Sequence, residues 1–466
     1  MSNLWKLRFL AVLGLLTCSL LFALSQNPAT EKPTDQKAPG EKNQQAEAIY
    51  GNTPEDLKPF AKYVKEPYKN YWVPSDSPVM FWGPGRDKPE PEVETVKIGV
   101  IAPISRSYEA YIGQSVLHGM QLALDDANAA GGYKGKRFEV VLKNDTGLWG
   151  ASANEVVSLS YDDKVWAIIG TVDGANTHIA IRVSLKIEIP WMTPGDPDPT
   201  YIETNIPWVF RCIGDDRQQN YLLVDYLFRK LNYQRVAILR ASNRYGRFGV
   251  REIRDGARRL NHPIVIEMAH KVGATDFTMH LDRIEAAQPE AIVYWGDAVD
   301  AANALNAIRA RGLKQPVYFC DRVVSDEFVK LAGPNAEGVI CTYPWDPNRS
   351  DPKLDTFRDA FKKRWGVEPD TYAAHAYDGI NMIIWAIQTA GLNRARIRDV
   401  LAYRPDPIPG VTGDVPLSSA LDDGGDVFLA CREQSRWVFH SREDLEIPRG
   451  KVIEKPRAER QQASVE

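Results

Sequence analysis

Residues 96–145 read VKIGVIAPISRSYEAYIGQSVLHGMQLALDDANAAGGYKGKRFEVVLKND, and this stretch decides the fold. It opens on a short apolar run with β-branched residues, 96–101, which predicts a strand. A helix is predicted over 113–130 because apolar residues there share one helical face, at Val116, Met120, Ala123 and Ala127. A second short apolar run, 138–142, predicts another strand. A strand, a helix and a strand in this order predict a βαβ unit of a parallel sheet.

The same alternation continues on the carboxyl-terminal side of this unit. Strands and helices alternate up to residue 192. A second alternating series runs from 218 to 320 and begins with a helix predicted over 218–231. Two such series predict an α/β protein with two doubly wound parallel-sheet lobes. Further helices are expected at 353–365 and 371–391. A hairpin is expected within 410–439, where Gly-Asp turns separate short strands.

The N-terminus has the pattern of an export signal. Lys6 and Arg8 precede an apolar run over residues 9–24, and Ala23-Leu24-Ser25 supplies small residues for cleavage. We therefore predict a signal peptide over 1–25 and a periplasmic or extracytoplasmic location. Two alternatives remain open: an uncleaved membrane tether, and a lipoprotein modified at Cys18.

The ends of the mature chain have a different composition from its centre. Residues 26–93 begin with a Lys-, Glu-, Gln- and Pro-rich stretch and continue with aromatic residues among prolines. This composition predicts an N-terminal extension that is disordered or draped over the domain surface. The tail, 441–466, is charged and predicted to be loose.

Composition and motifs exclude several classes of protein. The net charge of −4 argues against a nucleic-acid binder. No CxxC pair and no histidine pair at ligand spacing occur, so we expect no metal site. The sequence contains no GxSxG or HExxH motif, and residues 130–136 follow a helix instead of the strand that precedes a phosphate loop. We therefore expect neither a cofactor nor an enzyme.

Four cysteines remain after the predicted cleavage, at positions 212, 320, 341 and 431. In an oxidising compartment they have three possible disulfide connectivities. Cys320 and Cys341 end two short apolar runs that are candidates for neighbouring strands. The alternative, buried free thiols, is favoured because the cysteines are few for so long a chain.

An ordered set of motifs over residues 96–439 is similar to the periplasmic leucine/isoleucine/valine-binding protein family. The first helix ends in Asn-x-x-Gly-Gly and is followed by a turn and a strand that ends at Asp145. The later segments that match in order are Gly170-Thr171, Thr193-Pro194-Gly195, Arg244-Tyr245-Gly246, Asp276-Phe277, 333–338 (GPNAEG) and 372–379 (YAAHAYDG).

The resemblance implies a type I periplasmic binding protein, whose two lobes are joined by a three-segment hinge. The domain would cover 95–440. Lobe 1 would comprise about 95–215 and 345–402, and lobe 2 about 216–344 and 403–440. The ligand would lie between the lobes and be buried when they close.

The resemblance also implies ligand contacts in the first lobe. The family's loop after the third strand holds a ligand carboxylate with hydroxyls and amides, but its hydroxyl position falls on Gly174 here. The amides of Gly174 and Ala175 remain, and Asp173 beside them opposes an anion. In the next loop Gly195 is kept, Asp196 follows it, and Pro197 replaces a usual hydroxyl residue.

In the second lobe, Tyr245 matches the family's ligand-contacting tyrosine, and Asp321 matches the acidic residue that holds the ligand ammonium. An alternative for Asp321 is a salt bridge to Arg322 or a cap on the helix that begins near Ser325. Three aromatic residues complete the candidate ligand site: Tyr108, Tyr111 and Trp295.

These residues predict the extracytoplasmic solute-binding component of an ABC-type importer. The expected ligand is an amino acid or a related small amine or amide, and the loss of two hydroxyls indicates that it is not a standard branched-chain amino acid. The expected partner is a membrane permease, with no nucleic acid, and the protein is expected to be a monomer. The alternative is a ligand-sensing receptor or regulatory module on the same fold.

Overall fold

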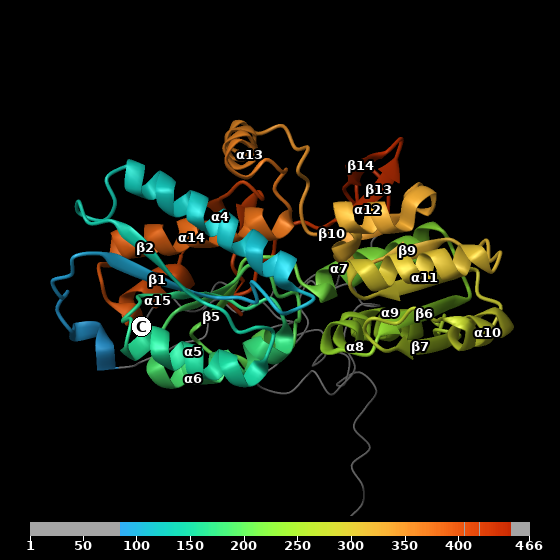
Figure 1. Ribbon diagram of the computed structural model, residues 1–466, viewed down its shortest axis with the longest axis horizontal. Helices are drawn as coiled ribbons and strands as arrows, with labels where there is room; N and C mark the ends of the chain where they lie inside the picture. The colour runs from blue at the N-terminus through green and yellow to red at the C-terminus, as the bar shows by residue number, and fades with distance from the viewer. Residues whose placement is uncertain (1–83, 405, 419, 449–466) are drawn as a thin grey trace, which may run out of the picture. The chain divides into compact units, whose positions relative to one another are not determined.

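The computed structural model describes residues 84–404, 406–418 and 420–448, and Figure 1 shows how their helices and strands are arranged. Within these residues the strands form two large sheets and one two-stranded pair. The first sheet is entirely parallel, in the order β2-β1-β3-β4-β5. Its strands are β1 (Val96–Ile101), β2 (Phe138–Lys143), β3 (Ile168–Gly170), β4 (Trp191–Thr193) and β5 (Val209–Arg211).

Helices cover both faces of this first sheet. Alternate residues of β1 point to opposite faces, so Ile98 and Val100 join one apolar cluster and Ile101 joins another. The first cluster contains α4 (Ala110–Ala129) and α14 (Thr371–Ala390), and the second contains α5 (Trp149–Tyr161) and α6 (Gly174–Ile187). In α4, a Cβ at Gly119 would lie 2.0 Å from the Ala373 carbonyl oxygen, so the glycine permits the close approach of α14.

The second sheet has the order β14-β13-β10-β9-β8-β6-β7. In it, β13 is antiparallel to both of its neighbours, β10 and β14. Its strands are β6 (Val236–Ala241), β7 (Ile266–His270), β8 (Ala291–Trp295), β9 (Val317–Phe319), β10 (Ile340–Tyr343), β13 (Phe428–Glu433) and β14 (Arg436–His440). Residues of α10 (Thr278–Ala286), α11 (Ala298–Ala310) and α12 (Asp326–Ala332) pack on one face. Residues of α7 (Asp216–Val224) and α9 (Arg251–Arg259) pack on the other. The predicted α/β fold with two parallel-sheet lobes is confirmed.

The chain passes between the two sheets three times. The first crossing lies between β5 and α7, and the second follows β10 and leads to α13 (Pro352–Trp365) and α14. The third runs from α15 (Arg394–Ala402) to β13 and includes the short pair β11 (Ile408–Pro409) and β12 (Asp414–Val415). The predicted hairpin region thus contains this short pair and the longer β13–β14 hairpin.

The predicted signal peptide and its two alternatives fall on residues 1–25, outside the described part of the chain. Of the predicted extension, residues 84–93 are described, and Arg86 forms an ion pair with Asp399 of α15 at 2.6 Å. Within the described residues, no helix is both long enough and apolar enough to cross a membrane. Cys212, Cys320, Cys341 and Cys431 are free thiols.

Candidate functional site

The candidate site lies where loops that follow strands of both sheets meet. Asp321 directly follows β9, is 2% exposed, and accepts hydrogen bonds from Tyr245 Oη at 2.7 Å and from Tyr372 Oη at 2.9 Å. Tyr245 belongs to α8 (Arg244–Gly249) of the second lobe, whereas Tyr372 belongs to α14. Burial raises the pKa of Asp321, and the Tyr245 hydroxyl opposes this shift. Asp321 therefore connects the lobes. It does not cap α12, because Ser325 does. The ion pairs of Arg322 go to Glu109 and Asp297, although the Arg322 charge also lowers the pKa of Asp321.

Arg322 points to different partners from its neighbour. It is 2% exposed, and its Nη1 donates to Glu109 Oε1 of the first lobe at 2.8 Å and also to Asp297 Oδ1. Its guanidinium carbon lies 3.7 Å from the centroid of the Tyr245 ring. This contact between a cation and an aromatic face is of the kind that binds amine ligands. The sequence resemblance did not assign a role to Arg322.

Asp173 occupies the place expected for a ligand carboxylate. It is the N-cap of α6, and its Oδ2 accepts from the amides of Ala175 at 3.1 Å and Asn176 at 3.2 Å. The Ala175 amide is one of the two donors that the resemblance assigned to the ligand, and the protein's own carboxylate already satisfies it. Thr177, the nearest hydroxyl, pairs with the Thr171 hydroxyl at 2.7 Å.

The absence of a side chain at Gly174 has a physical reason. Arg244 Nε donates to Asp198 Oδ2 at 2.6 Å, which joins the second lobe to the loop after β4. A Cβ at Gly174 would lie 2.2 Å from that carboxylate oxygen and 2.9 Å from Arg244 Nε. An interlobe ion pair thus fills the space beside position 174, where the family has a hydroxyl side chain.

Three predicted residues take supporting positions in the structure. Gly195 faces apolar side chains, because a Cβ there would lie 3.1 Å from Val172 Cγ1. Asp196 is buried beside it and accepts the Asp198 amide at 3.0 Å; burial and the Asp198 charge raise its pKa to about 8. Trp295 is fully buried in the core cluster of the second lobe, with its ring 6.3 Å from that of Tyr245.

The two tyrosines of the first loop differ in their surroundings. Tyr108 is half exposed, and its hydroxyl accepts a hydrogen bond from Asn243 Nδ2 at 3.2 Å. The Tyr111 hydroxyl is buried and has no partner among the described residues. Burial raises the pKa of Tyr111 well above its ordinary value, so its hydroxyl is a protonated donor.

Sequence reasoning missed Asp216, the first residue of α7. It is 1% exposed, and neither of its carboxylate oxygens has a partner among the described residues. Burial, followed by the charges of Asp321 and Asp198, raises its pKa well above the ordinary value. The helix was expected to begin at residue 218, which placed Asp216 in a connecting segment. The available signal was the pair of acidic residues, Asp215 and Asp216, in the first turn after a crossing.

A cavity of about 620 Å³ extends from this site. One end is lined by Tyr111, Asp321, Arg322 and Tyr372. Part of the remaining wall is aromatic and comes from the second crossing and the terminal hairpin, with Tyr343, Trp345, Trp437 and Phe439. Another part carries charged side chains, among them Arg358, Lys362, Glu368 and Asp370. The cavity therefore offers both aromatic and charged surfaces.

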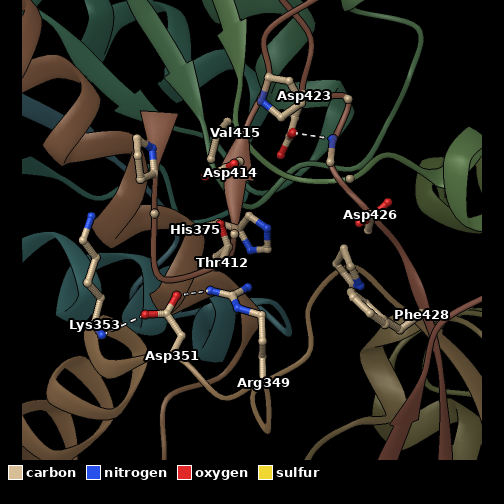
Figure 2. Close-up of a pocket in the computed structure, with 18 of the residues that line it drawn as sticks. Arg349, Asp351, Lys353, His375, Thr412, Asp414, Val415, Asp423, Asp426 and Phe428 are labelled. Atoms are coloured by element: carbon tan, nitrogen blue, oxygen red, sulfur yellow. Dashed lines mark hydrogen bonds and ion pairs between the residues drawn. The ribbon is translucent and has the colours of Figure 1, made fainter. Parts of the chain in front are cut away.

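A larger cavity, of about 830 Å³, lies at the three crossings and contains none of the predicted site residues (Figure 2). Asp351 accepts from Arg349 Nη2 at 2.8 Å, and Asp423 accepts from the Gly425 amide at 2.8 Å. Asp423 is 5% exposed, and burial raises its pKa to about 7. His375 donates Nδ1–H to the Thr371 carbonyl oxygen at 2.7 Å. This cavity belongs to the hinge.

Comparisons with known proteins agree with the fold. The sequence profile of a family described as "Periplasmic binding protein" matches residues 95–421. The chain is 26% identical over 349 residues to Leu/Ile/Val-binding protein homolog 2 of Brucella abortus, covering 73% of this chain and 90% of that protein. It is 29% identical over 301 residues to an amino acid binding protein of Pseudomonas aeruginosa, covering 64% and 79% respectively.

Among solved structures, the chain resembles the branched-chain amino acid transporter substrate binding protein of Streptococcus pneumoniae in complex with isoleucine. The TM-score is 0.68 at 26% identity, and the match covers 74% of this chain and 99% of that one. A leucine binding protein of Thermotoga maritima gives a TM-score of 0.69 at 21% identity, covering 74% and 98%. The predicted resemblance is confirmed.

Proposed function

Because the chain belongs to the periplasmic binding protein family, we propose that it is the solute-binding component of an ABC-type importer and holds a small amine between its lobes. The family implies an extracytoplasmic location. In this proposal the ligand is bound and released unchanged, and the closed, loaded form docks on a membrane permease.

The carrying observation is the unpartnered carboxylate of Asp216. An ionised carboxylate that is withdrawn from water without a partner costs several kcal/mol, so such groups are paired or protonated. A ligand ammonium would supply the missing charge and up to three hydrogen bonds. The neighbouring charges favour a cation too. Asp216 senses the carboxylates of Asp321, Asp198 and Asp215 and one guanidinium, that of Arg322.

The same geometry disfavours a ligand with an α-carboxylate. Asp173 already satisfies the amides of Ala175 and Asn176, and Asp198 with Arg244 fills the space beside Gly174. A ligand carboxylate placed there would meet two aspartates. The proposed ligand is therefore an amine or amide that lacks this group. Its body would extend into the aromatic part of the cavity beside Tyr111 and Tyr372.

The test compares matched ligands on the purified mature protein. Leucine and isoamylamine share a side chain and an amino group and differ by the carboxylate, and leucinamide replaces the carboxylate by a neutral amide. Thermal-shift and calorimetric titrations are expected to show binding of the amine and the amide, with leucine weaker by at least about tenfold, or 1.4 kcal/mol. Stabilisation by leucine, isoleucine or valine alone would refute the proposed ligand class.

A further inference from the structure

The β13–β14 hairpin carries three potential metal ligands on one face. Cys431 and Glu433 are two residues apart on β13, so their side chains point the same way. His440 of β14 is paired with Leu429, and paired residues of an antiparallel ladder share a face. The Cys431 sulfur, a Glu433 carboxylate oxygen and a His440 ring nitrogen all lie within 4.8 Å of one another.

These three side chains have no hydrogen bond or ion pair in the described part of the chain, which leaves their donor atoms available. The other described thiols differ, since each is fully buried and directed at a backbone carbonyl. Cys320 Sγ lies 3.1 Å from the Gly296 oxygen, and Cys212 Sγ lies 3.5 Å from the His375 oxygen. Cys431 is only partly buried, so a solvated ion can reach it.

We propose that Cys431, Glu433 and His440 bind a zinc ion. Thiolate, imidazole and carboxylate are the usual zinc ligands, at about 2.3, 2.0 and 2.0–2.2 Å. Ligand atoms of a tetrahedral site are therefore about 3.3–3.7 Å apart, and small side-chain rotations bring these three into that range. Water takes the fourth position, and binding displaces the thiol proton to the solvent. The thiolate selects zinc over magnesium and calcium, which prefer oxygen ligands.

The location gives the site a structural consequence. β14 is the edge strand of the second sheet, held there by β13. Trp437 and Phe439 alternate with His440 along β14, so they lie on the opposite face, where they line the cavity of about 620 Å³. A zinc ion that joins the two strands would brace that wall of the cavity.

Cobalt(II) is the probe for the test, because a thiolate ligand gives it a near-ultraviolet charge-transfer band and a tetrahedral site gives it strong visible bands. The full chain, freed of metal with a chelator, is titrated with Co²⁺ and then with Zn²⁺. We expect one equivalent of Co²⁺ to give both bands and Zn²⁺ to abolish them. Zn²⁺ should also raise the melting temperature of the wild-type protein.

Variants distinguish metal binding at this site from binding at other thiols, and loss of binding from loss of folding. Cys431→Ser should remove the charge-transfer band, and His440→Gln should weaken zinc binding by at least about 100-fold. His262→Ala, in the same lobe but outside the hairpin, should bind as the wild type does. Metal-free melting curves check that each variant is folded. Absence of the band in wild-type protein, or its survival in Cys431→Ser, would overturn the proposal.

Discussion

Glu109 and Arg322 form a buried ion pair that joins the two lobes, with Arg322 Nη1 donating to Glu109 Oε1 at 2.8 Å. Arg322 has a second carboxylate partner, Asp297, in its own lobe. Removing the arginine leaves two buried carboxylates unpaired, whereas removing Glu109 leaves the guanidinium one partner. Arg322→Gln should therefore cost about 3–5 kcal/mol of unfolding free energy and Glu109→Gln clearly less.

Denaturant titrations of ligand-free protein measure both costs. The double variant should lose less than the sum of the two single losses, by about 0.5–3 kcal/mol, because the two residues share one interaction. If the two single variants lost the same free energy of unfolding, or if the two losses simply added in the double variant, the proposed role of Arg322 as the shared partner of two carboxylates would be contradicted.

Asp216→Asn should uncouple stability from ligand binding. The neutral amide replaces a buried, unpartnered carboxyl group whose raised pKa disfavours its charged form, so ligand-free protein should unfold at an equal or higher temperature. Stabilisation by isoamylamine should fall by at least about 2 kcal/mol, because the ammonium loses its counter-charge. The control is Asp300→Asn, since Asp300 is buried in the same lobe but accepts the Gly273 amide at 3.0 Å. An unchanged amine response in Asp216→Asn would remove this residue from the site.

Gly174→Ser tests the packing beside the interlobe ion pair. The added Cβ would meet Asp198 Oδ2 at 2.2 Å, so the variant should lose about 1–3 kcal/mol of stability. Combining it with Asp198→Ala removes the obstructing carboxylate and restores a hydroxyl beside α6. The double variant should therefore be less destabilised than the two single effects predict, and its preference for isoamylamine over leucine should narrow. Calorimetry on all three variants measures both effects, and an unchanged preference would show that position 174 does not select the ligand.

Asp423 predicts a pH dependence at the hinge. Burial raises its pKa to about 7, whereas the unfolded chain ionises near 3.8. The folded state therefore holds a proton that the unfolded state loses, and the stability contribution falls as pH rises from about 4 to 7. Asp423→Asn should be more stable than wild type at pH 8, by at most about 4 kcal/mol, and equal to it near pH 4. Thermal unfolding across this range checks the difference, and a constant offset at every pH would exclude this origin.

Local patterns predicted the lobes because strand and helix periodicities are properties of neighbouring residues. The alternation of β1 with α4 follows from 96–130 alone, whereas the three-residue strand β5 has too short a pattern to recognise. The predicted single helix over 218–231 begins earlier in the structure, at Asp216, and its last part, 225–230, is a π-helical turn. Such changes arise from tertiary packing and cannot be seen in periodicity.

The site was partly predictable for the same reason. The match to the family's motifs identified Tyr245 and Asp321, and in the structure the two side chains form a hydrogen bond. Arg322 and Glu109 are 213 residues apart, so no spacing rule connects them. Trp295 ends a strand, like the polar residues of the site, but its indole turns into the core. Strand-end position therefore indicated a region, and only three-dimensional packing separated the groups that line a cavity, such as Asp321, from those buried in the core, such as Trp295.

The carboxylate of Asp173 accepts hydrogen bonds from two amides of α6, as the carboxylate of a bound amino acid would otherwise do. A carboxylate of the protein thus takes the position that the carboxylate of an amino acid would occupy. These two amides are satisfied whether or not a ligand is present, so in the proposed function a ligand carboxylate gains little from them. Selectivity against acids would then be set before any solute arrives, by a carboxylate that belongs to the polypeptide itself.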